Sequence, residues 1–106
     1  MATEGNAREL HLEQIDRVSR GILEAPGVTE PQDRLAAFEG TTVPEPIRSY
    51  LAKVRTQAWM IVDQDFEALR AAGHREDAIL ELTVAAALGE AARRHEAALR
   101  AVFGEP

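Results

Sequence analysis

The chain has 106 residues, which is the size of a single domain and excludes two independent catalytic domains. Its formal net charge of -6 argues against nucleic acid or an anionic membrane as the main partner, because both attract basic proteins. The sequence contains no cysteine, so a disulfide framework, a thiolate nucleophile and a zinc–thiolate site are all excluded.

The N-terminal part of the chain predicts two helices. Apolar residues at helical spacing over residues 6–24 indicate an amphipathic helix that ends before a Pro-Gly pair, and residues 1–5 are expected to be flexible. Thr29 and Gln32 have the form of a capping box, in which the threonine hydroxyl accepts from first-turn amides and the glutamine reaches back. We therefore expect a short second helix that ends at Gly40.

A third helix is expected to follow a second start signal over residues 42–45 and to end near Val62. Its apolar residues lie three or four positions apart and form one stripe: Ile47, Tyr50, Leu51, Val54, Ala58 and Ile61. Because large aromatic side chains dominate the cores of small domains, we expect Trp59, Tyr50 and Phe66 to pack between this helix and the next.

Acidic residues mark the start of a short fourth helix. Asp63 is predicted as its N-cap, Asp65 lies in its first turn and Gly73 ends it. The alternation of Asp63, Asp65 and Glu67 also suits a divalent cation, but the further ligands and the central glycine of a calcium loop are absent. Helix capping is the preferred interpretation, and no metal site is predicted.

The fifth helix is expected to run from about Glu76 to Phe103. Over residues 78–92 it is apolar almost all the way round, so neighbours must bury it on several sides. A monomer of this size can hardly provide them, and we therefore expect a homo-oligomer. Gly89 lies inside this helix, where glycine costs about 1 kcal/mol relative to alanine. It suggests that another helix backbone crosses close by, with a tolerated imperfection as the alternative.

These elements predict an all-α protein, a compact bundle of about five helices that forms one domain over residues 1–106. No period-two strand pattern competes with this interpretation. The N-terminal stretch lacks the basic start and apolar run of an export signal, and the longest apolar stretch, residues 82–89, is far shorter than the ~20 residues that cross a bilayer. We expect a cytoplasmic protein.

The second half of the chain contains a sequence pattern that is similar to that of a known protein family. VDQDFEALRAAG over residues 62–73 is followed by HREDAILELTVAAALG over residues 74–89, and then by Arg94 and Leu99. With its surroundings, residues 43–103, this pattern resembles the C-terminal half of the alkylhydroperoxidase D-like, carboxymuconolactone decarboxylase superfamily. The resemblance implies an all-α fold whose long C-terminal helices assemble into homo-oligomers, commonly trimers or hexamers.

The catalytic residues of that superfamily cannot be assigned in this chain. Its redox-active members use a Cys-x-x-Cys motif with a downstream His and a Glu as proton relay, and this chain has no cysteine. Residues 10–38 also contain no Glu and His at the motif spacing. Peroxidase and disulfide reductase activities are therefore excluded, and acid–base residues of the decarboxylase type cannot be assigned.

Two residues are weak candidates for a site, and neither is assigned as catalytic. His95 can serve as a general base near neutral pH, or it is a boundary histidine half-covered by a neighbouring subunit. Glu81 interrupts an apolar stretch and must be paired, protonated or functional if it is buried. The simpler interpretation pairs it with an arginine, Arg55 or Arg93, and no cofactor is predicted.

Three functions from different classes remain open. The preferred one is a non-catalytic helical oligomer that acts as an interaction or scaffold module. The second is an enzyme or small-molecule binder in which Glu81 and His95 of adjacent subunits form an acid–base pocket at an interface. The third is an accessory subunit of a larger enzyme, with another protein as its partner. The balance leans against an enzyme, and no ligand is assigned.

Overall fold

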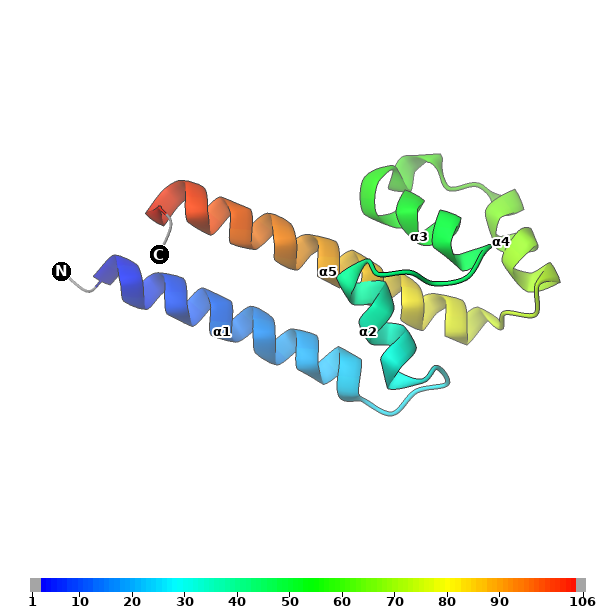
Figure 1. Ribbon diagram of the computed structural model, residues 1–106, viewed down its shortest axis with the longest axis horizontal. Helices are drawn as coiled ribbons and strands as arrows, with labels where there is room; N and C mark the ends of the chain where they lie inside the picture. Colours follow the sequence, from blue (N-terminus) through cyan, green and yellow to red (C-terminus); the bar gives the residue numbers. More distant parts are fainter. Residues whose placement is uncertain (1–2, 105–106) are drawn as a thin grey trace.

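The computed structural model describes residues 3–104, with the side chains of residues 7 and 9–104. Its helices are α1 (Thr3–Glu24), α2 (Pro31–Glu39), α3 (Ile47–Thr56), α4 (Asp63–Ala71) and α5 (Glu76–Phe103), with a 3₁₀ turn, η1 (Ala58–Met60), between α3 and α4 (Figure 1). The described chain contains no strand, and the expected all-α bundle of about five helices is confirmed. Of the stretch expected to be flexible, residues 1 and 2 lie outside the described residues, and residues 3–5 belong to α1.

Helix α5 is the element on which the others pack. Helix α1 runs antiparallel beside it, α2 crosses it near the middle, and α3 packs on its first half (Figure 1). We call α2, α3, α4 and the first half of α5 the body, and α1 together with residues 90–103 the arm. Among the described residues, no helix has the length and apolar content that crossing a bilayer requires.

The core lies where α2, α3 and α4 meet the first half of α5. Its buried apolar side chains are Ala37, Ile47, Tyr50, Leu51, Leu69, Ile79, Leu82, Ala85 and Ala86. At Gly89 the α2 backbone approaches α5 so closely that an added Cβ would lie 1.9 Å from the Phe38 carbonyl oxygen. The prediction that another helix backbone crosses at Gly89 is confirmed.

Helix α3 ends at Thr56, earlier than the predicted end near Val62. Gln57 leaves the helical conformation, with φ −146° and ψ 48°, and the chain makes the η1 turn before α4 begins. This turn lets Val54 and Ile61 both pack against the core from two different elements. The predicted stripe is therefore confirmed except at Ala58, which lies on η1 and is exposed, and a single helix does not carry all of it.

The aromatic residues of this region separate into two groups. Tyr50 is buried and packs against the half-buried Phe66, with ring centroids 5.6 Å apart. Trp59 lies on η1 and is 79% exposed, so its predicted place in the core is wrong. The physical reason is the early end of α3, because Trp59 lies on η1, after Gln57 has left the helical conformation.

The start of α4 is capped by a different residue from the one predicted. Asp63 is the first residue of the helix, and Val62 stands at the N-cap position. The Asp65 carboxylate reaches back and accepts the Val62 amide at 2.9 Å, and it also pairs with Lys53 at 2.9 Å. The acidic cluster therefore caps a helix, as preferred, but through Asp65 and not through Asp63.

The arm makes the molecule long and its surface large. The chain measures 56 × 29 × 19 Å and has a radius of gyration of 15.9 Å, compared with about 13 Å for a globular domain of this length. It exposes 7015 Å², whereas a typical monomer of this mass exposes about 5,800 Å². Figure 1 shows the two helices of the arm extending beyond the body, and this elongated shape exposes additional surface.

Candidate functional site

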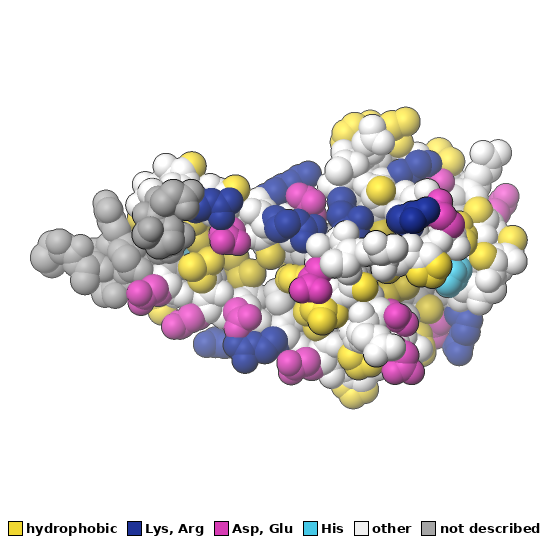
Figure 2. All heavy atoms as spheres, in the orientation of Figure 1, with side chains coloured by type: hydrophobic (Ala, Val, Ile, Leu, Met, Phe, Trp, Pro, Cys, Tyr) yellow, Lys and Arg dark blue, Asp and Glu magenta, His cyan; other side chains and the backbone are white. Residues whose placement is uncertain are grey.

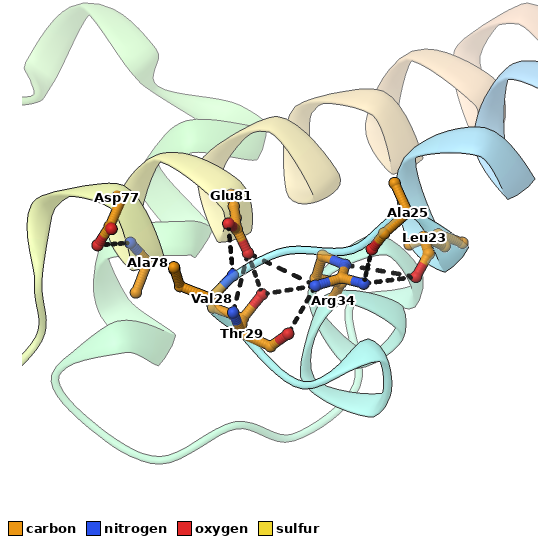
Figure 3. Close-up of polar contacts among 8 residues, drawn as sticks. All are labelled: Leu23, Ala25, Val28, Thr29, Arg34, Asp77, Ala78 and Glu81. Atoms are coloured by element: carbon orange, nitrogen blue, oxygen red, sulfur yellow. Dashed lines mark hydrogen bonds and ion pairs between the residues drawn. The ribbon is translucent and has the colours of Figure 1, made fainter.

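Glu81 lies on the first half of α5 and faces the loop between α1 and α2 (Figure 3). Its Oε2 accepts the Val28 amide at 2.8 Å. Its Oε1 accepts the Thr29 amide at 3.0 Å and the Thr29 hydroxyl at 2.6 Å. One carboxylate thus holds two consecutive amides of the loop against α5.

The capping box predicted for α2 does not form, because the Thr29 hydroxyl is used by Glu81. Helix α2 begins at Pro31, with Glu30 at the N-cap position and no side-chain cap. Proline at the first position has no amide that needs a cap. The pattern of Thr29 and Gln32 therefore correctly located the helix start and assigned the wrong partner to the threonine.

Arg34 joins the same cluster from α2 and is almost fully buried, at 3% exposure. Its Nη2 donates to the carbonyls of Leu23 at 3.1 Å and Ala25 at 2.6 Å, which are free because α1 ends there. Its Nη1 donates to the Thr29 carbonyl at 2.6 Å and lies 3.5 Å from Glu81 Oε1 (Figure 3). We call these contacts of Glu81, Thr29 and Arg34 the Glu81 network.

The network identifies the arginine partner of Glu81 as Arg34. The pairing expected with Arg55 or Arg93 is wrong, because both donate to main-chain carbonyls at the C-terminal end of α2 instead. Arg94 similarly donates to the carbonyl of Arg55 at the end of α3. Figure 2 shows several basic side chains close together on the face that it displays.

The hydrogen bonds of the network lower the pKa of Glu81 from its ordinary 4.5 to about 2. The Thr29 hydroxyl contributes most, followed by the Val28 and Thr29 amides, and the Arg34 charge adds to them. The carboxylate is therefore ionised and already bonded at both oxygens at neutral pH. This geometry supports a structural role for Glu81, which hydrogen-bonds to the α1–α2 loop and pairs with Arg34 of α2.

The pH dependence of stability follows from this shift. Because the folded pKa is below the unfolded one, the contribution of Glu81 is complete above about pH 4.5 and is lost as the pH falls towards 2. We expect Glu81→Gln to unfold at lower urea concentration than wild type at pH 7, and the difference to shrink steadily below pH 4.5. Urea denaturation at a series of pH values, monitored by circular dichroism, measures both the loss of stability at pH 7 and its decrease below pH 4.5.

Glu90→Gln is the matched control for this experiment. The Glu90 side chain is 24% exposed, compared with 26% for Glu81, and lies on the same helix. Its partners are the exposed Arg93 and Arg94, so its loss should change stability by less than about 1 kcal/mol. A pH-independent difference between wild type and Glu81→Gln would contradict the assignment.

His95 lies on the arm, where its ring meets the ring of His11 edge-on with centroids 5.5 Å apart. The side chain is half-buried, and its buried Nδ1 has no hydrogen-bond partner within the described chain. It borders an apolar groove of about 280 Å³ between α1 and α5, together with residues such as Ile15, Val18 and Ala91. Among the described residues, no carboxylate is therefore hydrogen-bonded to Nδ1 of His95.

The structure does not bring His95 and Glu81 together. They lie about 21 Å apart along α5, at 1.5 Å per residue, and face different neighbours. Glu81 belongs to the loop network, and His95 belongs to the groove beside His11. Within one chain the two weak candidates do not form an acid–base pair.

A polar contact between α3 and α5 was not anticipated from the sequence. The Thr83 hydroxyl donates to the Ile79 carbonyl at 2.6 Å, so the Tyr50 hydroxyl donates to Thr83 across 2.7 Å. The contact borders an open groove of about 410 Å³ whose rim holds the Arg70–Glu76 ion pair. No sequence signal pairs a tyrosine with a threonine on another helix, and the contact satisfies buried hydroxyls.

Comparison with family models, with curated proteins and with solved structures gives no match to this chain. In residues 3–104, no group of three or more His, Cys, Asp or Glu side chains is placed to hold a metal ion. The molecule is thus an all-α bundle with one carboxylate network that joins its elements and a two-helix arm with exposed apolar surface.

Proposed function

We propose that this chain is a non-catalytic, cytoplasmic helical module that assembles with copies of itself and serves as an interaction or scaffold protein. The observation that carries the proposal is its surface, about 1,200 Å² larger than that of a typical monomer of this mass. Stable interfaces bury about 800 Å² on each partner. The additional surface is therefore large enough to be the contact area of an oligomer.

The chemistry of the exposed surface supports the same proposal. Large hydrophobic side chains are exposed along both long helices, α1 and α5: Leu10, Val18, Leu80, Val84 and Val102. Apolar surface gathered on two neighbouring helices is typical of a site for another protein. The Glu81 network supports a structural role as well, because its carboxylate has both oxygens occupied.

A relationship to the alkylhydroperoxidase D-like superfamily is part of the proposal, without its thiol chemistry. The resemblance over residues 43–103 and the all-α bundle support it. The absence of cysteine excludes peroxidase and disulfide reductase activities of that type.

Native mass spectrometry of the wild-type chain tests the proposal. We expect a homo-oligomer at micromolar concentration, because the apolar arm surface is costly to leave in water. A mass equal to one chain, with the same result from light scattering, would contradict it. An oligomer that retains a small molecule would instead favour a binder with an interfacial pocket.

A further inference from the structure

One continuous apolar stripe runs along the exposed side of α5. Its members follow steps of four, three and four residues, twice over: Leu80, Val84, Ala87, Ala91, His95, Ala98 and Val102. All are exposed except the half-buried His95, and none carries a carboxylate, an ammonium or a guanidinium. A repeat of eleven residues matches the helical period closely, so the stripe stays straight for about 33 Å.

The spacing of the stripe is symmetric about Ala91. Leu80 and Val102 lie at equal distances from it in sequence, and so do Val84 and Ala98. If two α5 helices pack antiparallel with Ala91 at the crossing point, each stripe residue meets a stripe residue of the other copy. A two-fold interface requires this property, because residue i must contact j while j contacts i.

The charges of α5 favour the same arrangement. Residues 76–89 contain three acidic residues and no basic one, whereas residues 90–103 contain three arginines and two glutamates. Antiparallel packing places the acidic half of one α5 beside the basic half of the other. Parallel packing places the two acidic halves beside each other, and likewise the two basic halves.

Grooves between α1 and α5 border the stripe at its centre and near one end. The groove at Ala91 and His95 measures about 280 Å³, and a second of about 310 Å³ includes Leu80 and Val84. Their α1 walls are apolar residues such as Ile15, Val18 and Ile22. Side chains of a second stripe would pack against these apolar walls.

We propose that the occupant of this surface is a second copy of the chain, whose α5 stripe packs antiparallel on the first about Ala91, so that α1 and α5 of the two copies form a four-helix bundle. This inference rests on the proposed function and specifies its partner and geometry. The surface in excess of a typical monomer, about 1,200 Å² per chain, exceeds the roughly 800 Å² per partner of a standard interface.

Ala91→Glu tests the stripe. Its control is Ala97→Glu, another exposed alanine of α5 that lies about 120° away round the helix. We expect Ala91→Glu to weaken dimerisation at least 100-fold, because the two introduced carboxylates face each other in an apolar interface. Ala97→Glu should dimerise like wild type, and analytical ultracentrifugation measures both.

Single cysteines test the geometry, since the wild-type chain has none. Oxidised Ala91→Cys should form a covalent dimer, because a disulfide requires Cα atoms within about 7 Å. Ala98→Cys alone should not, since antiparallel packing separates its two copies by about 21 Å. Covalent dimers of Ala98→Cys would overturn the antiparallel arrangement in favour of a parallel one, and Ala97→Cys dimers would overturn the stripe.

The failure of this inference differs from the failure of the proposed function. A wild-type monomer overturns both. A wild-type oligomer that persists in Ala91→Glu, with no disulfide in Ala91→Cys, overturns only the stripe as the interface. Circular dichroism of each variant identifies any loss of folding, and the cysteine variants give an answer even if Ala91→Glu does not fold.

Discussion

Gly89→Ala is expected to lower the free energy of unfolding by about 3 kcal/mol, although alanine is the better helix former by about 1 kcal/mol. The new Cβ would lie 1.9 Å from the Phe38 carbonyl oxygen and 2.7 Å from the Phe38 carbonyl carbon. These are backbone atoms that cannot rotate away, so α2 must move off α5. Urea denaturation at one fixed chain concentration measures the change, because oligomer stability depends on concentration.

Gly21→Ala is the control for this substitution. Gly21 is also inside a helix, and nothing lies within 4 Å of the position of an added Cβ. The helix propensity of alanine should therefore act alone and stabilise α1 by about 0.5–1 kcal/mol. Stabilisation by both substitutions would show that α2 does not cross α5 at Gly89.

Arg34→Ala is expected to be the second severe substitution, with a loss of about 3–5 kcal/mol in unfolding free energy. It removes the donor for the main-chain carbonyls of Leu23, Ala25 and Thr29 and leaves the Glu81 carboxylate without its cation. These hydrogen bonds are part-buried, and a carbonyl that loses its donor there keeps part of the free-energy cost of leaving water. The same urea experiment at pH 7 measures the loss.

Arg48→Ala provides the comparison for Arg34→Ala. Arg48 is exposed and pairs with Glu45 one helical turn away, so its removal should cost less than about 1 kcal/mol. Equal losses for the two arginines would mean that the Glu81 network does not hold the α1–α2 loop. Arg34→Lys should restore stability only in part, since an ammonium group cannot reach several separated carbonyls at once.

Helix positions were predictable because their signals are local. The limits of α5, Glu76–Phe103, agree with the acidic start and the apolar period of the sequence. Glycine at the end of a helix was equally informative: Gly40 and Gly73 both adopt positive φ, of 75° and 95°. The Gly89 crossing was predictable for a related reason, since a residue with a helix penalty inside an apolar helix indicates a close neighbour.

The partners of individual side chains were not predictable. Glu81 was identified as a carboxylate that needs a partner, yet that partner is Arg34, far away in sequence, and not Arg55 or Arg93. The choice depends on how the α1–α2 loop folds back, and no local pattern encodes that path. The Thr29 hydroxyl was misassigned for the same reason, because a contact with α5 replaces a local cap.

The sequence by itself determined the all-α class, the number of helices, and the exclusion of thiol chemistry, since composition and a period of 3.6 residues are properties of the chain alone. The tertiary structure alone decided which faces of α5 are buried by α1, α2 and α3 and which remain exposed at Leu80, Val84 and Val102. It also exposed Trp59 by ending α3 early. The hydrophobic effect is not directional, so the identity of an apolar residue does not specify which residue it will contact. Only the packed fold determines that contact.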